Sequence, residues 1–302
     1  MRIAITGREG QVVRALQERT PMYNAAVVAI GRPELDLSRP ETVRASLRNA
    51  APQVIVNAAA YTAVDQAEAE PEIATHINEG GARAVAEVAA EMGVPLVHLS
   101  TDYVFDGASD RPYRETDPVG PLGVYGRSKL AGEQAVAAAT PNHVILRTAW
   151  VYSPFGRNFV KTMLRLAETR NEVAVVADQQ GSPTSALDIA DDILAVCRNL
   201  LERPDDPALR GVFHVTGAGT ATWASFASAI FEAAGSLGLP RASVRPIATA
   251  DYPTPARRPL NSRLDCSKIT ALHGVRLPEW RSSLVECVRR LALDAHSAGA
   301  TS

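Results

Sequence analysis

Tyr125 and Lys129 are the residues whose types and spacing most directly suggest chemistry. They stand four apart in the run 125–129 (YGRSK), so on a helix they would share one face, about one turn apart. An ammonium group beside a phenol favours the phenolate, which predicts a Tyr125 that exchanges protons near neutral pH. Upstream, a hydroxyl of either Ser100 or Thr101 is available to hold a carbonyl or alcohol oxygen against that phenol. The same spacing occurs on ordinary helices, so the surrounding elements must decide between the two interpretations.

Strand-like apolar runs alternate with helical patterns along the first two thirds of the chain. The strands are expected at 3–6, 26–30, 53–58, 96–99, 144–147 and 212–216, and the helices at 11–19, 40–48, 71–92, 125–138 and 188–201. Such alternation with short connections predicts an α/β fold, a doubly wound parallel sheet (Rossmann-like) with a smaller C-terminal substrate-binding lobe. The expected division is 1–152 plus 187–217 for the NAD(P)-binding domain and 153–186 plus 218–302 for the lobe.

The composition is that of an ordinary globular protein. The 302 residues are 46% hydrophobic and 21% charged, with a formal net charge of -2, so no nucleic-acid partner is expected. No apolar segment approaches the length needed to span a bilayer, so no membrane partner is expected. The first seven residues resemble a strand rather than a signal peptide. Cys197, Cys266 and Cys287 are far apart and odd in number, and the six histidines show no metal-ligand spacing. We expect a cytoplasmic protein with no metal site.

The turn after the first strand has the residues of a dinucleotide-binding loop. Gly7 and Gly10 would let the backbone approach a pyrophosphate, which the N–H groups of Gln11 and Val12 at the helix start would help to hold. The spacing is Gly-x-x-Gly, and Val13 stands where the usual fingerprint has its third glycine. Looser packing between helix and strand is therefore expected at this position.

The ends of the next two strands should complete the cofactor site. Strand two runs into Gly31-Arg32 with no acidic residue, which favours a 2′-phosphate and hence NADPH, with NADH as an accepted alternative. Asp36 and Leu37 are expected to flank the adenine. Small residues after strand three permit close passage of the cofactor, and the residues expected near its ribose and pyrophosphate are Ala60, Tyr61 and Thr62.

Taken together, these residues resemble the extended short-chain dehydrogenase/reductase superfamily, and within it the dTDP-4-dehydrorhamnose reductase family. The matching runs are 57–65 (NAAAYTAVD), 100–105 (STDYVF), 124–133 (VYGRSKLAGE), 147–152 (RTAWVY), 178–184 (DQQGSPT) and 252–265 (YPTPARRPLNSRLD). They extend over nearly the whole chain, and the last two distinguish this family from the wider superfamily. Val13 and the missing acid at Gly31-Arg32 depart from the usual pattern and affect cofactor preference, not the reaction.

The resemblance implies reduction of the C4 ketone of dTDP-4-dehydro-L-rhamnose by a reduced nicotinamide, a step of dTDP-rhamnose biosynthesis. In that scheme Tyr125 donates a proton to the C4 alkoxide, and Lys129 holds the nicotinamide ribose and lowers the Tyr125 pKa. Thr101 binds the keto oxygen. Two preplaced donors then stabilise the negative charge where it forms.

Substrate contacts follow from the same resemblance. Thr101, Asp102 and Tyr103 should touch the sugar together with Trp150, whose alternative is a packing role between lobes. The nucleotide half should lie against the second lobe, where the candidates are Arg257, Arg258, Asn261 and Ser262. Asn158 and Gln180 are weaker candidates. The acids in the range 66–72 are interpreted as a solvated helix start with no role in the site.

Three functions stay open at this stage. The first is the reductase, and the second is another nucleotide-sugar enzyme of the superfamily, an epimerase or dehydratase. A 4,6-dehydratase needs an acid pair after the threonine, whereas Thr101 is followed by Asp102 and then Tyr103. The third is a non-catalytic NADP-binding regulatory subunit, against which the intact Thr101, Tyr125 and Lys129 argue. The oligomeric state is left open, with a homodimer among the options.

Overall fold

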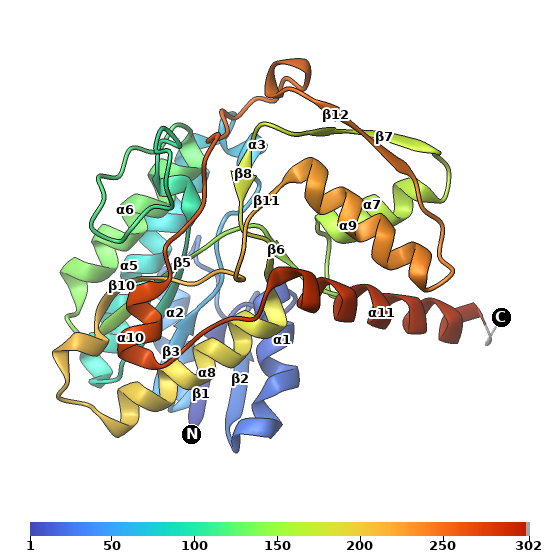
Figure 1. The fold of residues 1–302 in the computed structure, drawn as a ribbon. Coiled ribbons are helices and arrows are strands. Elements are labelled where there is room, and N and C mark those ends of the chain that lie inside the picture. The colour runs from blue at the N-terminus through green and yellow to red at the C-terminus, as the bar shows by residue number, and fades with distance from the viewer. Residues whose placement is uncertain (300–302) are drawn as a thin grey trace.

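A six-stranded parallel sheet forms the centre of the protein (Figure 1). Its strands are β1 (Arg2–Thr6), β2 (Ala26–Ile30), β3 (Val54–Asn57), β4 (Leu96–Thr101), β5 (His143–Thr148) and β10 (Gly211–His214). The structure, a computed structural model, describes residues 1–299. The strand order is β10-β5-β4-β3-β1-β2, so the direction of winding reverses between β1 and β3. Ligands of open parallel sheets bind at the carboxyl ends of the strands beside such a reversal.

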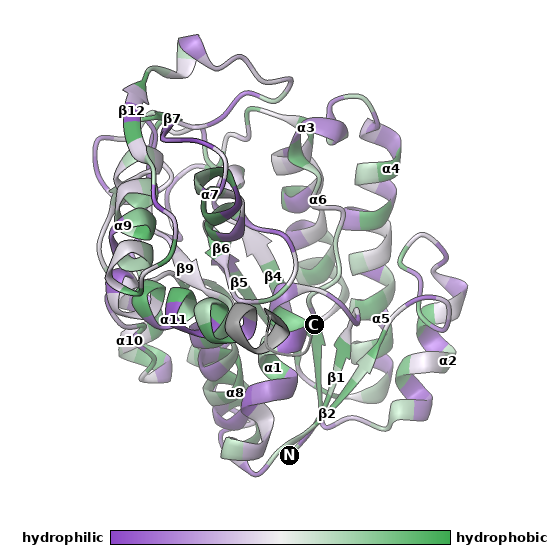
Figure 2. Cartoon of the chain, turned by 90° about the vertical axis from the view of Figure 1, so that its right-hand side faces the viewer, coloured by the Kyte–Doolittle hydropathy of each residue, from purple (hydrophilic) through white to green (hydrophobic). Residues whose placement is uncertain are grey.

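Helices cover both faces of the sheet, which confirms the predicted doubly wound α/β fold (Figures 1 and 2). One face packs against α1 (Gln11–Arg19) and α8 (Ala186–Glu202), and the other against α2 (Glu41–Ala50), α5 (Ala82–Met92) and α6 (Val124–Ala139). Alternate strand residues enter the two cores: Ile3 and Ile5 face the first, whereas Ala4 faces the second. Strands that are apolar on both faces are typical of parallel sheets.

The predicted single helix over 71–92 is interrupted by a wider π turn. It consists of α4 (Pro71–Thr75), a π-helical segment (His76–Gly81) and α5. Within the π turn, Asn78 is buried and its amide bonds to two partners, the backbone of Tyr61 and the hydroxyl of Ser128. Since π turns often bring one side chain to a functional position, the interruption has a local reason: it connects the end of β3 to α6.

A smaller lobe packs around its own hydrophobic core beside the sheet (Figure 1). It contains α7 (Phe159–Ala167), α9 (Trp223–Ser236), α11 (Trp280–Gly299) and two parallel strands, β7 (Glu172–Val176) and β12 (Ser243–Ile247). Phe226 and Trp280 lie at its centre, with 0% and 1% of their surfaces exposed. The sequence pattern did not predict the β7–β12 pair, because its two strands lie far apart in the chain.

Short elements connect the sheet to the lobe. They are α3 (Val64–Ala67), α10 (Ser267–His273), the strands β6 (Val151–Tyr152), β8 (Gln180–Gly181), β9 (Thr184–Ser185) and β11 (Ala221–Thr222), and 3₁₀ turns at Thr20–Tyr23, Asp102–Val104, Pro207–Leu209 and Thr249–Asp251. β6 pairs with β9 and β8 with β11, so the segment between β7 and α8 is tied both to the segment after β5 and to the segment after β10.

Among residues 1–299, no helix has the length and apolar character needed to cross a bilayer. Within the same residues, no cluster of three or more histidine, cysteine, aspartate or glutamate side chains has the arrangement of a metal site. The thiols of Cys197, Cys266 and Cys287 are all free.

Candidate active site

The end of β4 places a hydroxyl and a carboxyl at the carboxyl edge of the sheet. The strand extends two residues beyond its predicted end, so that Thr101 is its last residue. Thr101 Oγ1 accepts a hydrogen bond from the Tyr103 N–H at 3.2 Å and donates to Asp102 Oδ1 at 2.9 Å. Asp102 is 2% exposed, and burial raises its pKa to about 6, although hydrogen bonds from Thr101 and Ser262 oppose the rise.

Helix α6 brings Tyr125 against this strand end. Tyr125 is the second residue of the helix, and its ring meets that of Tyr103 edge to face, with 5.7 Å between centroids. Gly126 makes this approach possible, because a Cβ there would lie 2.2 Å from the Tyr103 carbonyl oxygen. Burial raises the pKa of the Tyr125 phenol, and a hydrogen bond with Thr101 counteracts that rise. Tyr125 and Thr101 therefore converge on one point.

Lys129 lies one turn further along the same helix, as the spacing predicts, but it does not acidify Tyr125. Its Nζ donates to the backbone carbonyl of Leu99 at 2.7 Å, and the side chain is 3% exposed. Burial lowers the Lys129 pKa to about 8, against an opposing effect of Glu133. The expectation of a Tyr125 pKa lowered by Lys129 is thus wrong for this structure, since desolvation of the phenol dominates and shifts its pKa upward.

Ser100, the alternative to Thr101, is directed away from the phenol. Its hydroxyl donates to Glu133, which also forms a two-point ion pair with Arg147, with 2.6 Å between Arg147 Nη2 and Glu133 Oε2. Both charged side chains are buried, at 5% and 4% exposure. This pair joins β4, β5 and α6 behind the site, so Thr101 is the hydroxyl that remains for a substrate oxygen.

The first turn after β1 has the shape of a phosphate cradle. Gly7 adopts a φ of +101°, which side chains rarely allow, and Gly10 precedes α1 without any side-chain cap on the helix N–H groups. Uncapped N–H groups at a helix start suit a pyrophosphate, so this turn fits a dinucleotide. Val13 is buried with its Cγ2 over Gly7, and it fills the position where looser packing was expected.

The neighbouring strand ends supply further candidate cofactor contacts. Arg32 is exposed after β2, and Arg8, which packs against Gly31, pairs with Glu34 at 2.7 Å. Asp36 accepts hydrogen bonds from Ser38. The other residues expected to contact the cofactor differ in solvent exposure: Leu37 is buried, Ala60 and Tyr61 are half-buried, and Thr62 is exposed. The Tyr61 hydroxyl donates to Glu70 at 2.7 Å.

Gln11, also predicted to contact the cofactor, connects the phosphate turn to the start of the small lobe. Its Oε1 accepts from Ser153 and Asn158, and its Nε2 donates to the Val151 carbonyl. Asn158 also caps α7 by accepting from the Lys161 N–H. Gln11 and Asn158 therefore hold the two lobes together through side chains, and the sequence offered no signal for this pairing.

Trp150 stands at the entrance to the small lobe in an unusual backbone conformation. Its φ is +47°, which is rare for a bulky residue, and its ring stacks on Trp223 with centroids 3.6 Å apart. Gly181 leaves room for the indole, because a Cβ there would lie 2.4 Å from Trp150 Cε2. The stacked and enclosed ring shows the packing role for Trp150, whereas its contact with the sugar stays a prediction.

The segment 252–262, which we call the strap, passes from the small lobe back to the sheet. Arg257 is exposed, whereas Arg258 bonds to Asp65 at 2.7 Å and contacts Tyr103. Asn261 is buried and donates to two backbone carbonyls, those of Ser109 and Arg111. Both amide hydrogens of Asn261 are thus used, which argues against the expected substrate contact. Ser262 is buried beside Asp102, and Gln180 bonds to the strap through its backbone.

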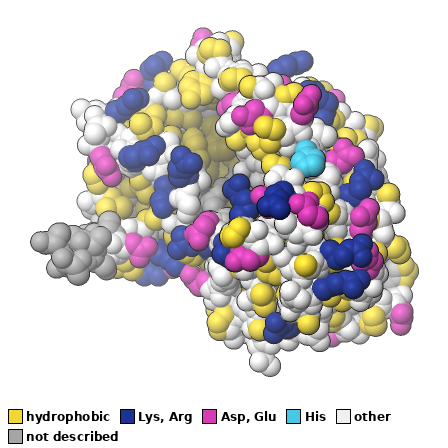
Figure 3. All heavy atoms as spheres, turned by 180° about the vertical axis from the view of Figure 1, so that it is seen from behind, with side chains coloured by type: hydrophobic (Ala, Val, Ile, Leu, Met, Phe, Trp, Pro, Cys, Tyr) yellow, Lys and Arg dark blue, Asp and Glu magenta, His cyan; other side chains and the backbone are white. Residues whose placement is uncertain are grey.

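A cavity of about 640 Å³ continues from Arg258 into the small lobe. It is lined by apolar side chains of α7, β7 and β12, including Met163, Val175 and Ile247, and by Trp223 and Tyr252. Figure 3 shows this side of the molecule hollowed, with hydrophobic side chains in the hollow and Lys and Arg side chains around it. Because Arg258 lines the cavity and contacts Tyr103, whose ring meets that of Tyr125, the cavity lies next to the Thr101–Tyr125 pair.

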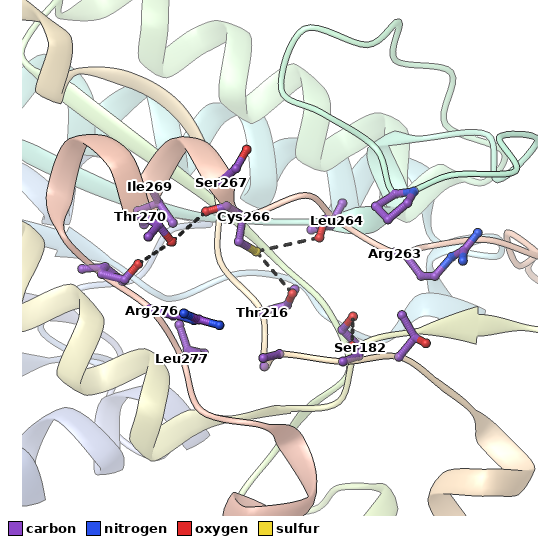
Figure 4. Close-up of a pocket in the computed structure, with 16 residues that line it drawn as sticks. Ser182, Thr216, Arg263, Leu264, Cys266, Ser267, Ile269, Thr270, Arg276 and Leu277 are labelled. Carbon is purple, nitrogen blue, oxygen red and sulfur yellow. Dashed lines mark hydrogen bonds between the residues drawn. The ribbon is translucent and has the colours of Figure 1, made fainter.

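A second cavity, of about 290 Å³, lies elsewhere, between the loop after β10 and α10 (Figure 4). Its lining includes Thr216, Cys266 and Arg276, and the Cys266 sulfur lies 3.4 Å from the Thr216 hydroxyl. None of the predicted catalytic or cofactor residues lines it.

Comparison with known proteins agrees with this geometry. A family model described as the RmlD substrate binding domain matches residues 1–293. The chain is 51% identical over 298 residues to the dTDP-4-dehydrorhamnose reductase of Sinorhizobium fredii, a match that covers 99% of this chain and 100% of the relative. This chain belongs to the dTDP-4-dehydrorhamnose reductase family. The resemblance inferred from the motifs is thereby confirmed.

Two further family members support the assignment. The Escherichia coli K12 dTDP-4-dehydrorhamnose reductase is 43% identical over 296 residues and covers 96% of this chain. A crystal structure of the Bacillus anthracis dTDP-4-dehydrorhamnose reductase in complex with NADP superimposes with a TM-score of 0.88 at 36% identity, covering 96% of this chain and 99% of that one. The family and the Rossmann-like fold are therefore those expected from the sequence.

Proposed function

We propose that this chain reduces the C4 ketone of dTDP-4-dehydro-L-rhamnose to give dTDP-L-rhamnose, with NADPH as the reductant. The observation that carries the proposal is the convergence of Thr101 and Tyr125 at the end of β4, with Lys129 one helical turn away. The relatives named as reductases of this sugar match the chain over nearly its whole length. Reduction needs a proton donor beside the ketone, and the geometry supplies one.

Tyr125 acts as that proton donor. Because burial raises its pKa, the phenol remains protonated at neutral pH and donates a hydrogen bond to the keto oxygen. As negative charge develops on this oxygen, its basicity rises above that of the phenolate, and the proton moves from Tyr125 to the C4 alkoxide. The Thr101 hydroxyl, which donates to Asp102 Oδ1 in this structure, turns to the same oxygen when the substrate binds and stabilises the charge where it forms.

Lys129 holds the nicotinamide ribose. Its ammonium group has three N–H donors, one of which binds the Leu99 carbonyl, so two remain for ribose hydroxyls. The fixed position of the amine orients the ribose below the Thr101–Tyr125 pair. When bound, the reduced nicotinamide supplies the hydride, and the protein supplies position and proton.

NADPH preference is assigned to the turns after β1 and β2. The exposed Arg32 follows β2, the strand whose end lies beside the adenosine ribose in such folds, and would contact the 2′-phosphate. No acidic residue ends β2 to bind a free 2′-hydroxyl. Arg8 is nearby but shares its charge with Glu34, so Arg32 provides the principal attraction. The NADP complex of the Bacillus anthracis relative supports this choice.

The sugar nucleotide lies across the cleft between the two lobes. The sugar contacts Thr101, Asp102 and Tyr103, with Trp150 beside it. The diphosphate lies near Arg258, with the exposed Arg257 next to it, and the nucleoside enters the cavity between α7 and β7. In this arrangement residues 1–152 and 187–217 form the cofactor domain, and 153–186 and 218–302 form the substrate lobe.

The alternative functions differ in their use of the cofactor. An epimerase or dehydratase returns the hydride and consumes no NADPH, and the dehydratase would need a second acid where Tyr103 stands. A regulatory subunit would bind NADPH without turnover. We therefore expect absorbance at 340 nm to fall in proportion to product when dTDP-4-dehydro-L-rhamnose is added with NADPH, and to stay constant with dTDP-glucose. NADPH binding without consumption would overturn the proposal.

A further inference from the structure

The acidic segment 65–70 (DQAEAE) contributes carboxylates that bind other parts of the cleft, which its sequence does not indicate. The acids in the range 66–72 are predicted to form a solvated helix start, which fits the exposed Glu72 but not Glu68 and Glu70, and Asp65 belongs to the run 57–65. The three carboxylates of the segment 65–70 are half-buried, and each binds a different part of the cleft. Asp65 binds the strap, Glu68 binds the start of α6, and Glu70 accepts the hydroxyl of Tyr61.

Glu68 replaces the missing cap of the catalytic helix. Gly123 precedes α6 and has no side chain to satisfy the helix N–H groups, and Glu68 Oε1 accepts from the Val124 N–H at 2.7 Å. A Cβ at Gly123 would lie 2.6 Å from the same oxygen, so a side chain at 123 would displace the Glu68 carboxylate from its present position. A negative charge here also matches the positive end of the helix. Tyr125 follows Val124 directly, in the turn that Glu68 holds.

Asp65 holds the opposite side of the cleft. Its Oδ1 accepts from the Ala256 N–H at 3.3 Å and its Oδ2 from Arg258 Nη2 at 2.7 Å, so one carboxylate fixes both the strap backbone and the guanidinium. Arg258 Nε also lies 3.5 Å from the Thr254 hydroxyl. With these contacts, the guanidinium is held at the mouth of the large cavity, beside Tyr103.

We propose that Asp65 and Glu68 are positioning residues for the two halves of the reaction site. Glu68 sets the position of the proton donor Tyr125, and Asp65 sets the position of Arg258 for the diphosphate. The inference rests on the proposed function of Tyr125 and Arg258. Because the two acids are three residues apart on one short segment but have different partners, their replacement should give separable effects.

Replacement of Glu68 tests the first half. Glu68→Ala removes the acceptor, frees the first turn of α6 and should lower kcat about tenfold, while KM for the sugar nucleotide and Kd for NADPH stay within twofold. Glu68→Gln retains a carbonyl oxygen and should recover most of kcat. Glu72→Gln is the matched control, since Glu72 is exposed at the start of α4, and it should behave as the wild type.

Replacement of Asp65 tests the second half. Asp65→Asn retains an acceptor for the Ala256 N–H but removes the negative charge that pairs with Arg258. The KM for the sugar nucleotide and the Kd for dTDP, measured by calorimetry, should therefore rise about tenfold, with kcat nearly unchanged. A fall in kcat alone for Asp65→Asn, or a rise in KM alone for Glu68→Ala, would overturn the assignment. Equal loss of both parameters in both variants would also overturn it, since a general structural role predicts that result.

Two readouts separate this inference from the proposed function. Hydrogen exchange of the peptide that contains Val124 should be faster in Glu68→Ala than in the wild type, and unchanged in Asp65→Asn. Binding of dTDP should weaken in Asp65→Asn and stay unchanged in Glu68→Ala. Both results are expected even if the wild type reduces a different keto sugar, whereas unaltered exchange and binding would overturn the positioning roles in an active enzyme.

Discussion

The two ends of the cleft differ in the polarity of the side chains that form them. At the end of β4, Thr101, Asp102 and Lys129 are at most 6% exposed and are fixed by hydrogen bonds to neighbouring backbone and side chains. In the small lobe, the cavity of about 640 Å³ is lined mainly by apolar and aromatic side chains, and Arg258 stands at its mouth. One end is a rigid polar constellation and the other is an apolar recess.

This difference assigns separate energetic tasks to the two ends. Preplaced donors at the strand end are worth most when charge develops on the keto oxygen, so they should affect kcat. The apolar recess and its arginine contact parts of the substrate that do not react, so they should affect affinity. Replacements at the strand end should therefore lower kcat, and replacements at the apolar recess should raise KM.

The largest effect is expected from Tyr125→Phe. Without the phenol, the C4 alkoxide loses its proton donor, and kcat should fall about 10²-fold or more while Kd for NADPH is nearly unchanged. Steady-state kinetics and fluorescence titration of NADPH measure the two quantities. Wild-type turnover by this variant would remove Tyr125 from the mechanism and abolish the contrast between the two ends.

Arg258→Ala should show the opposite pattern. Loss of the guanidinium removes a charge-assisted contact with the diphosphate, so KM for the sugar nucleotide should rise about tenfold or more with kcat within threefold. Arg289→Ala is the control, because Arg289 forms an exposed ion pair with Glu286 away from the cleft. If kcat falls and KM does not change, Arg258 belongs to the catalytic end instead.

The pH dependence sharpens the role of the amine. Burial lowers the Lys129 pKa to about 8, so the group is charged below this pH and loses its charge as the pH rises through it. We expect kcat/KM for NADPH to fall about tenfold per pH unit above that point. Lys129→Arg keeps its charge in this range, so its weaker activity should lack the alkaline limb. If kcat/KM falls at the same alkaline pH in the wild type and in Lys129→Arg, another group is responsible for the titration.

The smallest effect concerns cofactor choice at the far edge of the sheet. Arg32→Ala should lower kcat/KM for NADPH about five- to tenfold and leave the NADH value nearly unchanged, since an exposed cation is partly screened. Arg39→Ala, also exposed and paired with Glu41, serves as the control. Equal losses with both cofactors would show that Arg32 does not recognise the 2′-phosphate.

The sequence predicted the sheet well because its signals are local. The helix at Gln11–Arg19 and the strand at Ala26–Ile30 have the expected ends, since glycine turns and apolar runs mark them. The β7–β12 pair was not predicted, because its pairing partners are about seventy residues apart and each strand alone has a weak pattern.

The candidate site divides in the same way. Thr101, Tyr125 and Lys129 were predicted from short motifs, whereas the partners of Asp65 and Glu68 lie 191 to 193 and 56 residues away. No spacing rule indicates such contacts, so an acidic run looked like a solvated helix start. The Tyr125 pKa was also predicted in the wrong direction, because burial cannot be deduced from a four-residue spacing.

Isotope transfer follows hydride addition to C4 and the part of Tyr125 as the proton donor in one experiment. NADPH deuterated at both C4 positions of the nicotinamide is incubated with dTDP-4-dehydro-L-rhamnose, and the sugar product is analysed by NMR and mass spectrometry. We expect one deuterium at C4 of the sugar with the wild-type protein, and the same product formed at least about 10² times more slowly with Tyr125→Phe. A product without deuterium at C4, or an unchanged rate in the variant, would contradict it.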